Sequence, residues 1–332
     1  MSKPLSNFAH LFPEVIFEAT EQLGGRCTGR YIPLNAMENR VYDISMEDED
    51  NRITKFYRPG RWERKTIESE HEFLRNAFAA EIPVVCPLEK EGNTLFEING
   101  IFFAIFPKRP GRLEPELNDE QLKRLGRYLA RLHNVGAELK SQPRLELTPE
   151  TYGRACVRAL KEMGQLPPGN LGAIYQQLVS EICDRSEPFF EGVEKILIHG
   201  DCHAGNILWK GNEPYFIDFD DMIYAPPVQD FWMLMGGDDE YAIKNRDKII
   251  DAYLEIRDFD ERTLKLVEPL RALRLICFSS WIGLRWEDGA FKQAFPHFGT
   301  EKYWQQQLEH LSLQLERIKS DRKSTRLNSS HT

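Results

Sequence analysis

Apolar residues gather in four short segments near the start of the chain, all rich in β-branched and aromatic side chains. Charged turns, or turns that contain Gly or Asn, separate these segments, and the pattern is typical of an antiparallel sheet. The predicted strands are residues 40–45, 53–58, 94–100 and 101–109. Between the second and third strands, apolar residues return to one helical face and predict a helix over residues 62–81.

The periodicity changes after a joint that contains Pro and Gly, "KRPGRLEP" at residues 108–115, which is the candidate hinge. Beyond it, apolar residues recur every three or four positions. The predicted helices are residues 119–136, 171–190, 245–257, 263–286 and 301–320. The fold class is therefore α+β, with a small antiparallel β lobe over residues 1–110, crossed by one helix, and a larger, mainly helical lobe over residues 111–320. Residues 321–332 are expected to be a disordered or non-native tail.

Length and composition agree with two lobes, because 332 residues with 41% hydrophobic side chains can bury a large core. The 52 acidic residues exceed the 43 basic ones and give a formal charge of -9, which disfavours a nucleic-acid partner. The six cysteines form no CxxC pair, so the sequence indicates neither a zinc site nor a disulfide scaffold. Without a signal peptide or an apolar stretch of about 18 residues, we expect a cytoplasmic protein with no membrane partner, and a monomer by default.

A dense group of polar residues interrupts the helical pattern near residue 200, in "HGDCHAGN" and "YFIDFDD". Short apolar runs at residues 206–209 and 215–218, joined by "KGNEP", predict a β-hairpin that brings Asp218 near Asn206, with Asp201 on the preceding loop. Amide and carboxylate oxygens suit Mg2+, and the D-x4-N spacing is that of phosphoryl-transfer enzymes, in which the Asp accepts a proton from the acceptor. Asp201 is therefore the predicted base, and Asn206 and Asp218 are the predicted metal ligands.

Single residues of this group have simpler explanations, since an Asp before a turn is usually a cap, and only the whole string indicates catalysis. Asp220 and Asp221 compete with Asp218 for the metal. Alternation along a strand would place Asp218 and Asp220 on the same side. Asp218 is preferred because it directly follows the apolar run, with Asp220 behind it as a supporting partner. His199 is expected to support the loop. Two roles stay open for His203, either a residue that only marks the family or a contact near the phosphates.

The β lobe supplies a candidate cation, since Lys55 lies inside the second predicted strand. A nucleotide kinase needs such a lysine to hold the phosphates, and a helix carboxylate to position the lysine. Glu70 is the predicted partner, with Glu72 and Glu68 as alternatives. An outward-facing, solvated lysine is the simpler explanation for Lys55 taken alone.

The loop before residue 40 is a candidate for contact with the phosphates. Its sequence, "PLNAMENR", lacks the glycines of a Gly-rich phosphate loop. The backbone N–H groups from Asn35 to Asn39 would still face a phosphate, and the small Ala36 would allow a close approach. A simple turn is the alternative interpretation.

The motifs "HGDCHAGNILW" and "FIDFDD", with "KFYRP" upstream and "PPVQDFWML" downstream, resemble the aminoglycoside phosphotransferase and choline kinase superfamily of protein-kinase-like enzymes. Within it, the chain is most similar to the bacterial stress response kinase A family. The resemblance covers nearly all of residues 10–310. It implies a bilobal protein-kinase-like fold, Mg2+ and ATP as cofactors, and transfer to Ser/Thr of a protein substrate in a cytoplasmic envelope-stress and cell-survival response. Autophosphorylation is a separate expectation.

The resemblance also assigns roles to single residues. Asp201 would be the catalytic base, and Asn206 and Asp218 would bind Mg2+, with Asp218 counted as catalytic because it joins the metal to the phosphates. Lys55 would hold ATP with Glu70 as its partner, and Ala36 and Asn39 would lie at the nucleotide. Asp230 would brace the catalytic loop. "HGD" in place of "HRD", and "DFD" in place of "DFG", make regulation through an activation loop doubtful.

Two other functions remain open from the sequence. A small-molecule alcohol kinase of the homoserine, choline or aminoglycoside type would use the same catalytic residues. A choline substrate would require an aromatic cage, for which Trp232, Trp281 and Trp286 are available, although their helical spacing favours a place in the core. A pseudokinase that only binds partners is disfavoured because every expected catalytic position is occupied.

Overall fold

The structure, a computed structural model, describes residues 8, 10–34, 36–234 and 240–328. The chain divides into two compact units, each assembled from separate stretches of sequence. The first takes Met1–Arg144, Leu197–Met222 and Met233–Phe259, and the second takes Leu145–Ile196, Ile223–Trp232 and Asp260–Thr332. The boundaries of these units differ from the boundary near residue 110 that the sequence predicts between two lobes, and that lobe boundary remains a prediction.

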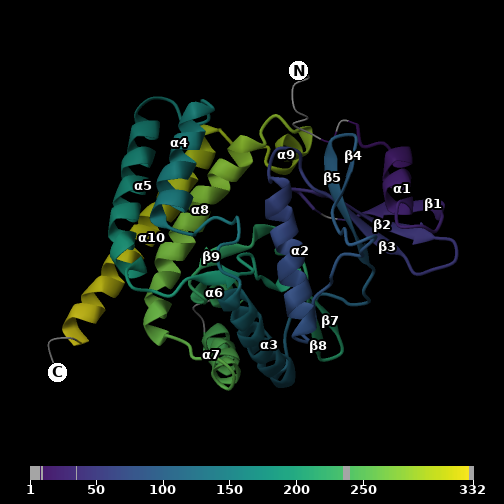
Figure 1. The fold of residues 1–332 in the computed structure, drawn as a ribbon. Helices are drawn as coiled ribbons and strands as arrows, with labels where there is room; N and C mark the ends of the chain where they lie inside the picture. Colours follow the sequence, from purple (N-terminus) through teal and green to yellow (C-terminus); the bar gives the residue numbers. More distant parts are fainter. Residues whose placement is uncertain (1–7, 9, 35, 235–239, 329–332) are drawn as a thin grey trace. The chain divides into compact units, whose positions relative to one another are not determined.

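A five-stranded antiparallel sheet dominates the first unit, in the order β1-β2-β3-β5-β4 (Figure 1). Its strands are β1 (Cys27–Pro33), β2 (Arg40–Met46), β3 (Arg52–Phe56), β4 (Phe96–Ile98) and β5 (Ile101–Pro107). The four strands predicted from the sequence are confirmed. β1 escaped prediction because only its first residue is even partly buried, so no apolar face marks it in the sequence.

Two helices accompany this sheet, α1 (Pro13–Glu21) and α2 (Arg64–Ala79). Ile16 and Ala19 of α1 pack with Ile44, Phe56 and Phe103 in one buried cluster. α2 is the predicted crossing helix, and it buries Ile67, Phe73 and Leu74 on one face, as the periodicity indicated. Glu70 lies among these buried positions and is only 2% exposed, so a carboxylate is held inside the unit.

The rest of the first unit includes the strands of the polar motif and two helices that lie side by side (Figure 1). The strands are β6 (Ile196–Ile198), β7 (Ile207–Lys210) and β8 (Glu213–Phe216), and the helices are α3 (Asp119–Glu138) and α7 (Glu240–Leu254). Asn118 and Gln121 form a capping box that starts α3. Gly136 lets α3 approach β6, because a Cβ there would lie 1.8 Å from the Leu197 carbonyl oxygen. The motif that follows β6 is thereby fixed to α3.

Helices make up most of the second unit, and α4, α5, α8 and α10 lie alongside one another (Figure 1). Its elements include α4 (Ala155–Glu162), α5 (Gly169–Phe190), β9 (Ile223–Ala225), α8 (Val267–Leu284), α9 (Gly289–Ala294) and α10 (Glu301–Asn328). Tyr175 of α5 and Trp304 of α10 are fully buried, with ring centroids 5.0 Å apart. No helix in the described ranges is long and apolar enough to cross a membrane.

α10 continues to Asn328, past the end predicted near residue 320. Part of the segment expected to be disordered is therefore helical. Residues 329–332 lie outside the described residues, and the non-native origin of the tail remains a prediction.

Candidate active site

The loop that carries Asp201 is held by His199, which is fully buried. The His199 Nδ1 atom accepts a hydrogen bond from the Asp201 backbone N–H at 3.4 Å. Its Nε2 atom therefore carries the proton and donates to the Ile217 carbonyl at 3.0 Å, while the ring packs 4.4 Å from the ring of Phe219. These contacts agree with the supporting role predicted for His199, and they tie the loop to the hairpin.

Asn206 ends a short 3-10 helix, Ala204–Asn206, and turns its amide nitrogen toward Asp201. The Nδ2 atom donates to the Asp201 carbonyl at 3.0 Å and lies 3.5 Å from Oδ2 of the Asp201 carboxylate. In the described part of the chain, no donor contacts the Asn206 Oδ1 atom.

The predicted hairpin is confirmed, with β7 and β8 paired in antiparallel register from Ile207 opposite Phe216. The Ile217 N–H donates to the Asn206 carbonyl at 3.0 Å, which places the start of β7 beside the residue that precedes Asp218. Asp218 has a φ of 60°, in the left-handed region that a residue with a side chain adopts only when its surroundings enforce it. Its side chain is 51% exposed and lies 3.3 Å from Lys55 Nζ.

The expected alternation of Asp218 and Asp220 on one strand face is wrong. β8 ends at Phe216, and residues Phe219–Asp221 form a 3-10 turn, so the extended geometry that alternation requires is absent there. Asp220 is buried, with its side chain only 3% exposed, while Asp218 reaches solvent. Asp220 accepts from Arg61 and, at 3.2 Å, from Asn39 Nδ2, so its carboxylate is engaged inside the protein.

Lys55 lies at the centre of the sheet and is surrounded by three carboxylates. Its Nζ atom is 3.3 Å from Glu70 Oε1, 3.3 Å from Asp218 Oδ1 and 3.6 Å from Asp220 Oδ1. Sequence reasoning chose Glu70 over Glu72 and Glu68, and Glu70 is the one of the three that contacts this lysine. The solvated position considered for Lys55 is excluded, because its side chain is only 8% exposed.

Electrostatics distribute the charges within this cluster. Burial lowers the pKa of Lys55, but Glu70, Asp220 and Asp218 together raise it well above its usual value, so Lys55 is charged. Burial raises the pKa of Asp220, yet Arg61, Lys55 and Arg144 hold that pKa below its usual range. Burial raises the pKa of Glu70 to about 7, which Lys55 opposes only in part. The negative charge of Glu70 is therefore less well compensated than that of Asp220.

The loop that precedes β2 is partly buried. Asn39 is buried, its Oδ1 accepts from the Arg58 N–H at 3.1 Å, and its Nδ2 donates to Asp220. Its side chain thus connects the loop to the Asp220 cluster. Ala36 lies in the loop and is partly exposed, while Asn35 lies outside the described residues. Contact of Ala36 and Asn39 with a nucleotide remains a prediction.

Two arginines near the site were missed by sequence reasoning. Arg61 contacts both Asp220 and Asp221 with its guanidinium group. Arg144 donates to the Asp220 carbonyl at 2.8 Å. The "RPGRW" stretch contains Arg61 but gives no reason to select it, and Arg144 lies 76 positions from its partner, a distance over which the sequence alone gives no signal.

The residues present fit Mg2+ and ATP. The described residues hold no cluster of three or more His, Cys, Asp or Glu side chains suited to a metal. Mg2+ in nucleotide enzymes needs no such cluster, because it takes one or two protein oxygens and completes its shell with substrate phosphates and water. An exposed Asp218 carboxylate and the Asn206 Oδ1 atom supply such a pair, and Lys55 supplies the neighbouring positive charge.

Residues assigned to the second unit give less information on the site. Asp230, in α6 (Val228–Leu234), is fully buried, and its bracing of the catalytic loop remains a prediction. The proposed cage residue Trp281 packs on the rings of Phe278, Phe291 and Phe295. Trp281 therefore belongs to an aromatic cluster, as its helical spacing favoured.

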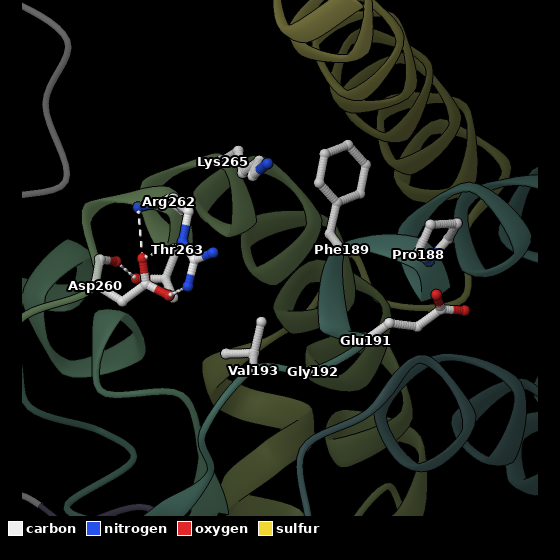
Figure 2. Close-up of a pocket in the computed structure, with 9 residues that line it drawn as sticks. All are labelled: Pro188, Phe189, Glu191, Gly192, Val193, Asp260, Arg262, Thr263 and Lys265. Atoms are coloured by element: carbon white, nitrogen blue, oxygen red, sulfur yellow. Dashed lines mark hydrogen bonds and ion pairs between the residues drawn. The ribbon is translucent and has the colours of Figure 1, made fainter. Parts of the chain in front are cut away.

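A cavity of about 260 Å³ lies within the second unit, between the C-terminal end of α5 and the segment that precedes α8 (Figure 2). Arg262 on its wall is held by Asp260 through two contacts of 2.8 and 2.9 Å. None of the predicted catalytic residues lines this cavity. It is thus separate from the cluster around Lys55.

Comparison with known proteins identifies related sequences. A family model described as "Phosphotransferase enzyme family" matches residues 31–267. "Stress response kinase A" of Escherichia coli (strain K12) is 38% identical over 308 residues, which cover 92% of this chain and 93% of that protein. "Serine/threonine protein kinase RdoA" of Salmonella typhimurium (strain LT2) is 37% identical over 300 residues, 90% of this chain and 91% of that protein.

Solved structures of kinases share the fold. An amicoumacin kinase bound to AMP-PNP and Ca2+ superposes with a TM-score of 0.69 at 19% identity, over 87% of this chain and 92% of that one. A microcompartment-associated aminopropanol kinase gives a TM-score of 0.66 at 16% identity, over 92% and 97% of the two chains. The predicted kinase-like α+β fold is confirmed by these likenesses, which at such identities concern the fold alone.

Proposed function

Because the chain belongs to the phosphotransferase enzyme family, we propose that it uses Mg-ATP to phosphorylate Ser or Thr side chains of proteins in a bacterial stress response. The observation that carries the proposal is the meeting of Lys55, Glu70 and Asp218 in one unit with the Asp201 loop. The names of the relatives support the stress response and, in one case, the protein acceptor. A cytoplasmic location and a monomeric state belong to the same proposal.

In this mechanism Asp201 accepts the proton of the acceptor hydroxyl. The hydroxyl oxygen forms a bond to the γ-phosphorus of ATP, and the bond between that phosphorus and the β-γ bridging oxygen breaks, which releases ADP. The Asn206 amide donates to the Asp201 carbonyl and lies 3.5 Å from the Asp201 carboxylate, and so holds the base for this step. Catalysis arises mainly from positioning and charge neutralisation.

The nucleotide would be held by the cluster around Lys55. A bound Mg2+ supplies charge neutralisation for the phosphates, with Asn206 and Asp218 as its protein ligands. Lys55 contributes a buried positive charge that Glu70 and Asp220 keep in place. Since Lys55 also contacts Asp218, a metal held by Asp218 would lie near the lysine, and the two cations would bind neighbouring phosphate oxygens.

The acceptor class is tested by phosphate transfer from γ-labelled Mg-ATP to a generic basic protein and to the chain itself, followed by identification of the labelled amino acid. We expect phosphoserine or phosphothreonine that requires Asp201. The same reactions are run with homoserine, choline and an aminoglycoside. Label found only on such an alcohol would contradict the protein substrate while keeping the kinase chemistry.

A further inference from the structure

His203 lies against the carboxylate of Asp201. Its Nε2 atom is 3.5 Å from Asp201 Oδ2, and its side chain is 42% exposed. The backbone N–H of His203 donates to the Asp201 carbonyl at 2.9 Å, and the His203 carbonyl accepts from the Asn206 N–H at 2.9 Å. His203 is therefore built into the same turn as the base, with side chain and backbone both directed to it.

The hydrogen-bond pattern assigns the proton of this imidazole. The Gly205 backbone N–H donates to His203 Nδ1 at 3.0 Å, so Nδ1 acts as the acceptor. In a neutral imidazole with an accepting Nδ1 atom, Nε2 carries the hydrogen. The Nε2–H group therefore faces Asp201 Oδ2, the same oxygen that Asn206 Nδ2 approaches at 3.5 Å.

Gly205 makes this ring position available. A Cβ at residue 205 would lie 2.7 Å from His203 Cε1 and 2.9 Å from His203 Nδ1, both shorter than van der Waals contact. Any side chain there would move the ring away from its place. The absence of a side chain at Gly205 therefore leaves the space that the His203 ring occupies.

We infer that His203 is a positioning residue for the base: its Nε2–H group holds the Asp201 carboxylate together with Asn206, and Gly205 holds the ring in turn. The inference deepens the proposed kinase activity and rests on it. Two donors on one oxygen fix the plane of a carboxylate that otherwise rotates about its side-chain bonds. A hydroxyl that approaches then meets the base in a fixed orientation, which is the condition for efficient proton transfer.

The kinetic test compares the full-length chain with His203→Ala and His203→Gln in phosphate transfer from Mg-ATP to the basic protein. We expect kcat to fall about 10-fold in His203→Ala with the KM for ATP changed less than about 2-fold, because only orientation of the base is lost. Glutamine offers an N–H donor at similar reach and should restore kcat to within about 3-fold of native. An unchanged kcat, a rise in the KM for ATP alone, or no rescue by glutamine would overturn the inference.

A second variant moves the ring without removing it. Gly205→Ala should lower kcat to about the level of His203→Ala, because the new methyl group displaces the imidazole. His310→Ala is the matched control, since this histidine is exposed on α10, and it should retain native kcat. A native kcat in Gly205→Ala, with the fold intact by thermal unfolding, would contradict the role given to the ring.

The imidazole signals test the contact independently of turnover. In the 15N-labelled full chain at about pH 8, His203 should show the Nε2–H tautomer, and its Nε2 signal should shift in Asp201→Asn. The Nδ1–H tautomer, or a signal insensitive to Asp201→Asn, would overturn the inference even if the kinase activity is found. If the native chain transferred no phosphate to any acceptor, the proposed function would fail, while these signals would still decide the contact.

Discussion

The Nζ atom of Lys55 lies 3.3 Å from Oδ1 of Asp218, across 163 positions of sequence. Lys55 lies on β3, a central strand of the sheet. Asp218 lies two residues after the end of the hairpin strand β8. The contact joins the cation of one element to the exposed carboxylate of another within the same unit. In the proposed function, the groups for a phosphate and a metal would thus be arranged before either is bound.

Replacement of the Lys55 partner should weaken nucleotide binding. Glu70→Gln keeps the shape of the side chain but, at a pH above about 7 where Glu70 is ionised, removes a buried negative charge 3.3 Å from Lys55 Nζ, so the lysine is held less firmly. We expect the KM for ATP to rise about 10-fold, a loss of roughly 1.4 kcal/mol. Steady-state kinetics at saturating acceptor measure this change.

Glu68→Gln is the matched control for that experiment. Glu68 lies on the same helix, but its side chain is 50% exposed and pairs with Arg64 at 3.6 Å. Its KM for ATP should match the native value. An equal rise in the KM for ATP in both variants would mean that the contact between Glu70 and Lys55 has no specific role, and that only the loss of one negative charge from the helix matters.

Asp220 should be a determinant of stability. Its carboxylate is buried among Arg61, Lys55 and Arg144, so Asp220→Asn leaves these cations without their shared counter-charge. We expect the free energy of unfolding to fall by about 3 kcal/mol in urea denaturation. Asp221→Asn, whose side chain is 49% exposed, should cost less than about 1 kcal/mol. A native stability for Asp220→Asn would show that the buried cations are compensated elsewhere.

Metal dependence should follow the two predicted oxygen ligands. Asn206→Ala and Asp218→Ala should each raise the Mg2+ concentration for half-maximal activity by about 10-fold or more, and chelation of Mg2+ should abolish native activity. Asn212→Ala serves as the control, because Asn212 is exposed in the turn of the same hairpin. A Mg2+ requirement unchanged in both ligand variants would exclude these residues as metal ligands.

His71 should make the protein sensitive to acid. It is buried between the Tyr57 hydroxyl at 3.0 Å and Thr94 Oγ1 at 2.8 Å, and burial lowers its pKa to about 3. The unfolded chain binds a proton at about pH 6.5, while the folded chain does not, so stability is lost as the pH falls through this range.

Between about pH 6.5 and 4, the His71 contribution should lower the free energy of unfolding by up to about 3 kcal/mol. His71→Gln should lose this part of the pH dependence, whatever its stability at neutral pH. The measurement is urea denaturation of both proteins across that range. Parallel curves for the two proteins would contradict a neutral, buried His71.

Four strands of the sheet, six helices and the hairpin were accessible from the sequence because each depends on local periodicity or turn chemistry, whereas the short helices α1, α4 and α9 were not predicted. The pairing of Lys55 with Glu70 followed from the position of Glu70 before the apolar pair Phe73 and Leu74 on α2. β1 was missed because an exposed edge strand needs no apolar face.

The burial of Asp220 and its contacts with Arg61 and Arg144 could not be predicted from local sequence patterns. The failed alternation of Asp218 and Asp220 arises from a tight turn whose left-handed φ is enforced by the surrounding structure. Arg61 and Arg144 reach Asp220 from 159 and 76 positions away, and no local pattern encodes such a meeting. Charged side chains look alike in a sequence whether they are buried or solvated, and only packing separates them.

The most direct test of the proposed kinase mechanism is phosphate transfer from γ-labelled Mg-ATP by the native chain and by Asp201→Asn, with ATP binding measured for both by calorimetry. We expect Asp201→Asn to bind ATP within about 3-fold of native but to lose on the order of 10³-fold in kcat, because a general base is removed and the nucleotide contacts remain. Equal rates in the two proteins would contradict Asp201 as the base, and with it the active site described around Lys55 and Asp218.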